Sequence, residues 1–306
     1  MKTSVFIRKY GVFIWLAFSL FSCAVPHKPA IHPQNPSPMV EYTRPHERIP
    51  LDSIPLAGVM TDLSQGVQGR LYLPEKWKNA KTADLVIHFH GDARVAQYAV
   101  DRQDEPWILF HCQWGSGSSA YSRPVQAIGA GAFLDSVQAA IRKAAPDTRI
   151  NRIYLSGWSA GYGAIRSLIG NDRVADRVSG ILLLDGLHCS YVPEGKPMAE
   201  GGVIDSTRMQ PFLNWAHRAV SGEKAFLFTH SAVFPGTFAS TTETADYLLR
   251  SLGIKRQPQL AEGPVGMQQT SVATRGKFTI LSFAGNSAPD HVDHYHGMSV
   301  LLKQLE

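Results

Sequence analysis

The feature of this sequence that most restricts its fold is a Gly-x-Ser-x-Gly turn between an apolar run and a helix-like stretch. Ser159 lies between Gly157 and Gly161; the apolar run covers residues 153–155 and the helical pattern covers residues 164–169. A sharp strand-to-helix turn lifts the central serine out of a sheet and holds its backbone in a strained conformation. The flanking glycines lack a Cβ and give the neighbouring chain room to pass. The pattern therefore predicts that Ser159 is a nucleophile at the end of a strand.

The rest of the chain alternates strand patterns with helix patterns. The strand patterns are continuously apolar rather than alternating, which is typical of strands covered by helices on both faces. This order predicts an α/β fold, with a mostly parallel central sheet and helices on both sides. In addition to the apolar run before Ser159, the predicted strands are residues 67–73, 85–90, 107–112, 181–185, 225–229 and 278–283.

Composition restricts the class of protein further. With 306 residues and 44% hydrophobic residues, the chain can bury a sizeable core in one large α/β domain or two small ones. The net charge of +5 is spread along the chain, without a Lys/Arg run interleaved with aromatic residues. A nucleic-acid-binding surface is therefore not expected. The composition is globular from residue 56 onward, and we predict one catalytic domain over residues 56–306.

The N-terminus has the pattern of a secretory signal. Residues 1–22 combine a basic start with an apolar core, residues 12–21, that is too short to span a bilayer comfortably. The core ends in Leu-Phe-Ser-Cys, which resembles the bacterial lipobox, where the cysteine becomes the lipidated first residue of the mature protein. We predict a lipoprotein signal peptide over residues 1–22 and lipidation at Cys23, with an ordinary cleaved signal peptide as the alternative.

The segment after the signal is rich in proline and polar residues. Residues 23–55 cannot pair into a sheet and are expected to form a semi-extended linker. The prediction is a protein secreted across the inner membrane and held by acyl chains on the outer membrane or cell surface, facing the periplasm or the exterior. Two cysteines remain beyond the anchor, Cys112 and Cys189. We expect no disulfide between them, because their predicted strands are not neighbours.

In the order of its elements, the chain resembles the α/β-hydrolase superfamily over residues 56–306. The resemblance implies a triad in the order nucleophile, acid, histidine, each on a loop at the C-terminal end of a strand. It also implies an oxyanion loop after an earlier strand, often beginning His-Gly, and the sequence His90-Gly91-Asp92 matches that position. The expected oxyanion-hole donors are the backbone N–H of Ala160 and those of the Gly91-Asp92 loop.

Three histidines after the last predicted strand are candidates for the base. His291 lies a short loop beyond that strand, where a closing helix starts and a ring can point back at Ser159. His294 and His296 lie one turn or more farther along the same helix. We favour His291 and keep the other two as alternatives.

The acid that orients the base has two candidate locations. Asp185 directly follows the strand at residues 181–184, and an acid at this point is a known variant in the resembled family. The commoner location is after the next strand, where the first carboxylates are Glu243 and Asp246. Their surroundings are typical of a capped helix start, in which first-turn acids face the helix dipole. We favour Asp185, with Glu243 next.

Two other mechanistic classes remain open. His88, His90 and Asp92 match the His-x-His-x-Asp opening of a zinc-hydrolase motif, but Ala93 stands where that motif continues with histidine. Within a strand, His88 and His90 also point to the same side, so His88 can instead be a hydrogen-bonded histidine of the core. The second class is a binding lipoprotein without catalytic activity.

The sequence thus predicts a lipid-anchored, extracytoplasmic serine hydrolase without a cofactor. Ser159, His291 and Asp185 form the predicted triad, and a carboxylesterase is favoured over a peptidase or amidase because an alkoxide leaves more readily than an amine. The predicted partners are a small ester substrate and the membrane that holds the anchor, with no nucleic acid. Residues 190–222 are expected to form a cap or a substrate-selecting insertion.

Overall fold

The computed structural model describes residues 46–63 and 67–305. The chain divides into two units, Met1–Ile31 and His32–Glu306, and every described residue belongs to the second. The predicted signal peptide, Cys23 and residues 23–45 of the predicted linker lie outside the described residues. Among the described helices, none has the length and apolar character needed to cross a membrane.

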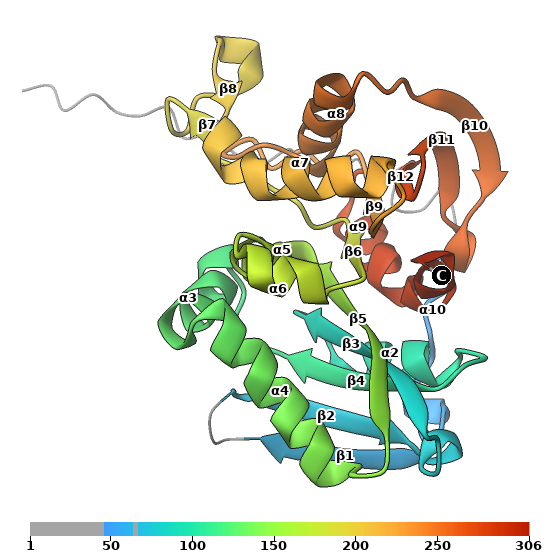
Figure 1. Ribbon diagram of the computed structural model, residues 1–306. Helices are drawn as coiled ribbons and strands as arrows, with labels where there is room; N and C mark the ends of the chain where they lie inside the picture. Colours follow the sequence, from blue (N-terminus) through green and yellow to red (C-terminus); the bar gives the residue numbers. More distant parts are fainter. Residues whose placement is uncertain (1–45, 64–66, 306) are drawn as a thin grey trace, which may run out of the picture. The chain divides into compact units, whose positions relative to one another are not determined.

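A ten-stranded sheet forms the centre of this unit (Figure 1), in the order β1-β2-β4-β3-β5-β6-β9-β12-β11-β10. The strands from β4 to β12 in that order run parallel, and antiparallel strands extend the sheet at both edges. The bounds are β1 Gly58–Leu63, β2 Gly69–Pro74, β3 Thr82–Phe89, β4 Trp107–Cys112, β5 Arg149–Trp158, β6 Gly180–Leu184, β9 Ala225–His230, β10 Gln257–Glu262, β11 Gln268–Arg275 and β12 Phe278–Phe283.

Helices cover both faces of the sheet and enclose two hydrophobic cores. One core is formed with α3 Ser118–Ile128, α4 Ala130–Ala144, α5 Tyr162–Ile169, α6 Asp172–Arg177, α7 Ser206–Val220 and α8 Thr241–Leu252. The other is formed with α2 Ala93–Asp101, α9 Ala288–His296 and α10 Met298–Leu302. Every residue of β4, β6 and β9 is buried, as their uninterrupted apolar pattern requires. The predicted α/β fold, with a mostly parallel sheet and helices on both faces, is confirmed.

The region predicted as a cap differs from the expectation. Residues 190–205 do form an insertion, in which β7 (Tyr191–Val192) pairs with β8 (Val203–Ile204) apart from the main sheet (Figure 1). However, α7 buries Met209, Phe212 and Trp215 in the core and belongs to the helical layer. The prediction of a cap over the whole of residues 190–222 is therefore wrong for its second half, because an amphipathic helix pattern fits either location.

Parallel strands bring the ends of distant segments to one edge of the sheet. Gly157 of β5 is paired with Phe89 of β3 on one side and with Leu183 of β6 on the other. The loops that follow these strands therefore emerge side by side, as in other open α/β sheets that bind ligands at this edge. Cys112 and Cys189 are both free and buried.

Candidate active site

Ser159 occupies the predicted strand-turn-helix junction. β5 ends at Trp158, a 3-10 turn covers Ser159–Gly161, and α5 follows directly. The φ of Ser159 is 47°, in the left-handed region that a non-glycine residue rarely adopts. A Cβ at Gly161 would overlap the carbonyl oxygen of Phe89, so only glycine fits where the turn passes β3. The junction thus holds Ser159 in the strained conformation that its sequence pattern predicts.

The loop after β6 packs against the backbone of Ser159. A Cβ at Gly186 would lie 2.5 Å from the nitrogen and 2.6 Å from the oxygen of Ser159. The preceding residue, Asp185, has a φ of 43°, a second strained position in the same contact. This packing brings the Asp185 loop directly beside the serine turn.

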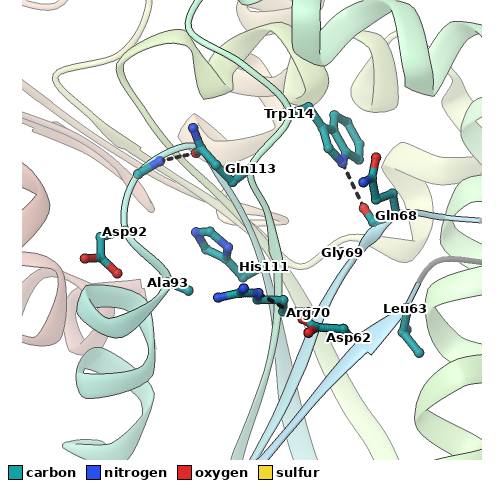
Figure 2. A pocket seen from close by; sticks show the side chains of 11 residues that line it. Asp62, Leu63, Gln68, Gly69, Arg70, Asp92, Ala93, His111, Gln113 and Trp114 are labelled. Atoms are coloured by element: carbon teal, nitrogen blue, oxygen red, sulfur yellow. Dashed lines mark hydrogen bonds and ion pairs between the residues drawn. The ribbon is translucent and has the colours of Figure 1, made fainter.

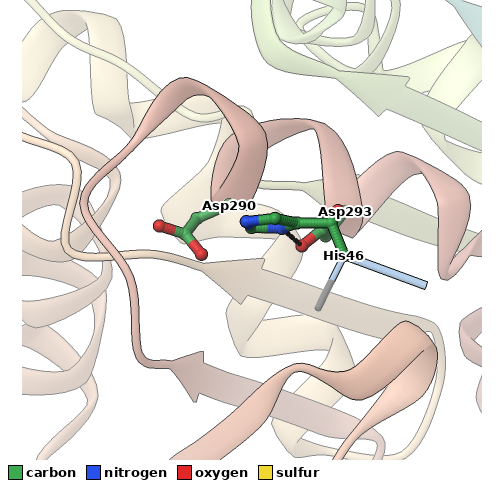
Figure 3. Close-up of side chains that lie close together, drawn as sticks. All are labelled: His46, Asp290 and Asp293. Carbon is green, nitrogen blue, oxygen red and sulfur yellow. Dashed lines mark hydrogen bonds and ion pairs between the residues drawn. The ribbon is translucent and has the colours of Figure 1, made fainter. Parts of the chain in front are cut away.

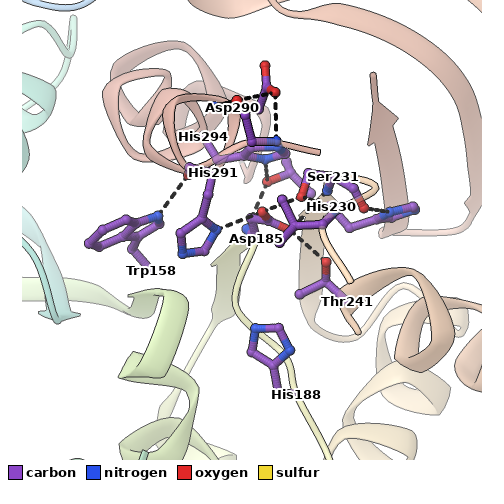
Figure 4. A network of polar contacts seen from close by, with 12 residues as sticks. Trp158, Asp185, His188, His230, Ser231, Thr241, Asp290, His291 and His294 are labelled. Carbon is purple, nitrogen blue, oxygen red and sulfur yellow. Dashed lines mark hydrogen bonds and ion pairs between the residues drawn. The ribbon is translucent and has the colours of Figure 1, made fainter. Parts of the chain in front are cut away.

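The carboxylate of Asp185 is buried and accepts four hydrogen bonds (Figure 4). Its side chain receives the backbone N–H of Ser231 at 2.9 Å, the hydroxyls of Ser231 and Thr241 at 2.6 Å each, and Nδ1 of His291 at 2.7 Å. Asp185 is only 1% exposed. With both oxygens occupied by fixed donors, the carboxylate has one orientation.

These contacts also determine the charge of Asp185. Burial alone raises the pKa of its carboxyl, because it disfavours the ionised form. At the low pH where this carboxyl titrates, the positive charges of His294 and His291, with hydrogen bonds from His291 and Ser231, outweigh burial and hold the pKa well below its usual range. Asp185 is therefore an anion at neutral pH.

His291 lies in the first turn of α9, which begins with a capping box formed by Ser287 and Asp290. Trp158 also contacts this turn of the helix: its Nε1 donates to the carbonyl of His291 at 3.0 Å, and the centroids of the two rings are 4.9 Å apart. Because Nδ1 donates to Asp185, Nε2 is the nitrogen left to accept a proton. Within the described residues Ser159 forms no hydrogen bond with His291, and such contacts commonly tighten only when substrate binds.

The other two histidines of α9 make different contacts. His294 is buried, and its Nδ1 is hydrogen-bonded to Thr229 at 2.8 Å. Burial lowers the pKa of His294, so its imidazole is neutral. His296 accepts the backbone N–H of Ile49 at 3.0 Å. Of the three candidates for the base, the structure brings His291 to Asp185.

The alternative acids have structural partners. Glu243 closes the capping box of α8 with Ser240 and accepts the hydroxyl of Tyr191 at 2.8 Å. Asp246 is ion-paired with Arg256 at 2.7 Å. Glu243 thus stabilises the start of α8, as its position in a helix start indicates, whereas Asp246 lies in the middle of α8 and is not the first-turn acid that was predicted.

The His90-Gly91-Asp92 loop follows β3 and lies beside the serine turn. His90 and Gly91 both have positive φ, 78° and 102°. The N–H of Gly91 donates to Oε1 of Gln113 at 2.8 Å, so it is already engaged. The N–H of Asp92 forms no hydrogen bond in the part of the chain that is described, while its carboxylate caps α2 by accepting from Arg94. Of the two loop donors, Asp92 is thus the one available to an oxyanion, together with Ala160.

Sequence reasoning missed Tyr295, which joins this loop to the histidine helix. The hydroxyl of Tyr295 donates to the carbonyl of Asp92 at 2.6 Å, and its ring fills the space that a Cβ at Gly91 would need. The ring also stacks on Trp158, with centroids 5.4 Å apart. One signal was present in the sequence: Tyr295 follows His291 by four residues and so shares its helix face.

The residues of the predicted zinc motif do not gather around a common point. His88 is hydrogen-bonded to Ser156 at 2.9 Å and to the carbonyl of His90 at 2.8 Å, and His90 to Tyr121 at 2.7 Å. Both ring nitrogens of His88 and the Nδ1 of His90 thus have protein partners, and the three residues of the motif do not form a group with metal-ligand proximity. The structure thus gives these histidines packing roles in the sheet and its neighbouring loop.

One group in the described part of the chain could hold a metal ion by proximity. Ligand atoms of His46, Asp290 and Asp293 lie within 4.8 Å of one another (Figure 3). However, Asp293 is paired with His46 at 2.6 Å and with Arg48 at 3.3 Å, and Asp290 accepts the hydroxyl of Ser287 at 2.6 Å. A guanidinium beside the group opposes a cation, so these contacts are best described as the attachment of residues 46–48 to α9.

The sequence matches no protein-family model and no curated relative. Solved structures similar to this chain include Est1E from Butyrivibrio proteoclasticus, at 11% identity and a TM-score of 0.40 over 81% of this chain and 98% of that chain. They also include the Pyrococcus horikoshii acylaminoacyl peptidase, at 12% identity and a TM-score of 0.45 over 81% of this chain and 40% of that chain. Similarity this low carries no activity across, so the functional argument depends on the side chains described above.

Proposed function

We propose that this protein is a serine hydrolase whose triad is Ser159, His291 and Asp185. The observation that carries the proposal is the 2.7 Å hydrogen bond from Nδ1 of His291 to the buried carboxylate of Asp185, in a loop packed against the strained backbone of Ser159. A histidine oriented by a buried anion activates a serine hydroxyl for acyl transfer once its free nitrogen reaches that hydroxyl, and the Asp185 loop already packs against the Ser159 turn.

The proposed reaction proceeds through an acyl-enzyme. Nε2 of His291 takes the hydroxyl proton of Ser159 as its oxygen attacks the substrate carbonyl. The N–H groups of Ala160 and Asp92 stabilise the oxyanion, each by up to a few kcal/mol. Collapse of the tetrahedral intermediate expels the alkoxide, which receives the proton from His291. Water then attacks the acyl-enzyme as His291 takes its proton, and collapse of this second intermediate releases the acid while His291 returns the proton to the oxygen of Ser159.

Carboxylic esters are the proposed substrates. An alkoxide is a better leaving group than an amine, so ester cleavage demands less of the acid step performed by His291. The peptidase alternative is tested with an ester and an amide that carry the same acyl group. Hydrolysis of the ester without measurable turnover of the amide supports the esterase; turnover of both contradicts it, because a peptidase also cleaves the more reactive ester.

The nucleophile is tested by covalent labelling with a fluorophosphonate. The wild-type protein should be labelled and Ser159→Ala should not. Ser167→Ala is the matched control, because Ser167 lies on the helix after the turn and donates only to the carbonyl of Gly163. Labelling that persists in Ser159→Ala rejects the assignment, and activity that is lost to a chelator and restored by zinc favours the metal class instead.

We further propose that the enzyme works outside the cytoplasm, held by lipid on Cys23. The support is the lipobox-like sequence and the proline-rich segment after it. Fractionation of the wild type and Cys23→Ser tests the anchor. The variant should move from the membrane to the soluble extracytoplasmic fraction, and retention on the membrane would reject lipidation.

A further inference from the structure

We propose that a polar cavity beside the candidate oxyanion loop binds the sugar of a carbohydrate ester, so that acylated carbohydrates are the substrate class. This inference rests on the proposed esterase function and deepens it. The cavity has a volume of about 550 Å³, within the range of small-molecule sites (Figure 2). Its walls come from β1 and β2, the loop after β3, and the segment at the end of β4.

The register of the sheet places this cavity at the right distance from the nucleophile. Cys112, Phe89 and Gly157 form one paired row across β4, β3 and β5. Gly91 and Ser159 each lie two residues beyond this row, at the same edge of the sheet. Two strand spacings, roughly 10 Å, separate β4 from β5, and the cavity residues on β2 and β1 lie three and four spacings from β5, roughly 15–20 Å. The sugar of an ester held at Ser159 can therefore reach the near wall of the cavity at Gln113 and Trp114, and a longer glycoside can reach the far wall at Asp62 and Arg70.

The lining matches a neutral polyhydroxylated ligand. Arg70 and Asp62 are paired with each other but keep further donor and acceptor positions, and the second carboxylate oxygen of Asp92 is an acceptor. The Oε1 of Gln113 is occupied by Gly91 and Tyr121, so its contribution is the second N–H of its amide. Sugar hydroxyls also donate and accept, so they can pair with such a mixed set. A long acyl chain would desolvate these groups without replacing their hydrogen bonds. A phosphate or carboxylate would meet two carboxylates and one guanidinium, which disfavours an anion.

Trp114 adds the apolar surface that a sugar ring needs. Its indole N–H donates to the carbonyl of Gln68 at 2.8 Å, and its ring stacks on Tyr121 with centroids 5.8 Å apart. The ring is thus fixed where it borders the cavity (Figure 2). The C–H groups of a sugar carry partial positive charge and pack favourably on an aromatic surface.

His111 supplies a buried polar group at the same cavity. It is only 2% exposed, and its Nε2 forms no hydrogen bond of regular geometry within the described residues, although the backbone of Gly91 lies close enough to oppose the effect of burial on its pKa. Burial lowers the pKa of His111 to about 4, so the ring is neutral and can donate and accept. An unsatisfied buried nitrogen is unfavourable, and a ligand hydroxyl is a partner of suitable chemistry.

The first experiment compares two esters on one enzyme. The substrates are an acetylated methyl glycoside of a di- or trisaccharide, long enough to reach Asp62 and Arg70, and 4-nitrophenyl acetate, which has no sugar to fill the cavity. In the double variant Asp62→Asn/Arg70→Gln, the ratio of kcat/KM for the sugar ester to that for the aryl ester should fall at least about tenfold, the effect of losing one or two hydrogen bonds. Both side chains are substantially exposed, 77% and 54%, so the variant should fold.

The matched control is Asp104→Asn/Lys303→Gln, which removes another exposed ion pair outside the cavity. Its substrate ratio should equal that of the wild type. An unchanged ratio in the Asp62/Arg70 variant would overturn the proposal.

The second experiment measures binding without turnover. Methyl glycosides of glucose, xylose and N-acetylglucosamine are titrated into Ser159→Ala while tryptophan fluorescence is followed. At least one should bind, and at least tenfold more weakly when Asp62→Asn/Arg70→Gln is added; no binding of any glycoside would overturn the sugar site. Glycoside binding together with a wild-type protein that hydrolyses no ester would instead reject the proposed function and leave the cavity assignment standing.

Discussion

The two sides of the candidate site are built differently. On the acid–base side, Asp185 is fully enclosed and receives four hydrogen bonds from fixed donors. On the cavity side, Asp62 and Arg70 form an ion pair at 2.9 Å, and 77% of the Asp62 side chain and 54% of the Arg70 side chain are exposed. The contrast fits the two proposed roles, because proton transfer requires one geometry, whereas recognition of a hydrated substrate tolerates exposed polar groups.

The position of each strand in the sheet explains the difference. β6 lies in the middle of the sheet and is buried along its whole length, so a carboxylate at its end is enclosed by neighbouring loops. β1 is the outermost strand on the other side and is exposed along much of its length, so Asp62 remains in contact with water. Substitutions at the two sides should therefore differ in size and in kind.

The largest expected effect on kcat follows from removal of the proposed acid, Asp185. Asp185→Asn should lower kcat by roughly a thousandfold to ten-thousandfold, because an amide cannot hold the imidazole in its required tautomer or stabilise its charged form. Glu243→Gln should change kcat less than about threefold, since this carboxylate caps α8. Ester hydrolysis by both variants, with circular dichroism as the control for folding, tests the pair. A large loss in Glu243→Gln alone would reverse the assignment.

A second prediction concerns the stability of the protein at acidic pH, which should depend on one buried histidine on each side of the site. Burial lowers the pKa of His111 on the cavity side and, together with the charge of Arg256, that of His230 on the acid–base side, each to about 4. Unfolded histidines titrate near 6.5, so between these values the unfolded state binds more protons and stability falls as pH decreases. Each histidine should remove about 2 kcal/mol from the free energy of unfolding between pH 7 and pH 5.

Denaturant unfolding at the two pH values tests this prediction. The stability lost between pH 7 and pH 5 should shrink by about 2 kcal/mol in His111→Gln and by a similar amount in His230→Gln. Stability that is independent of pH in the wild type would contradict the burial of these neutral imidazoles.

The third prediction concerns the residue that joins the two sides. Tyr295→Phe keeps the ring against Gly91 but removes the hydrogen bond to the carbonyl of Asp92. If this bond holds the oxyanion donor in place, kcat should fall about threefold to tenfold with little change in KM, since a net hydrogen bond contributes about 1 kcal/mol. Binding of a boronic acid that mimics the tetrahedral intermediate should weaken by the same factor. A change in KM alone would indicate a role in substrate binding instead.

The sequence predicted the fold where apolar patterns decide it. β4, β6, β9 and β12 were expected within one residue of their observed bounds, because strands buried on both faces need continuous apolar residues. β10 was not predicted: five of its six residues are exposed, and its sequence has no apolar pattern. The existence of such an edge strand depends on pairing with β11, which a local pattern does not encode.

The site was predictable in outline but not in its supporting contacts. The Gly-x-Ser-x-Gly pattern and the triad order implied by the resemblance predicted Ser159, Asp185 and His291 at strand ends, and the structure brings His291 to Asp185. Ser231 and Thr241, which hold that acid, carry no signal of their own, because their contact depends on how two loops fold together. Nor could spacing show that the N–H of Gly91 is engaged by Gln113, since side-chain rotamers decide it.

The smallest expected effect is on stability rather than activity, and it compares the loss of an exposed polar contact with the loss of a buried one. Asp62→Asn should change the free energy of unfolding by less than about 1 kcal/mol, because an exposed ion pair is only slightly more favourable than the same two charges solvated separately. Thr241→Val removes one donor from the buried carboxylate of Asp185 and should cost about 1–3 kcal/mol at similar volume. Denaturant unfolding of the two variants at pH 7 measures both. Equal losses would mean that the cavity side is as tightly organised as the acid–base side, and the distinction between a fixed catalytic half and an adaptable binding half would fail.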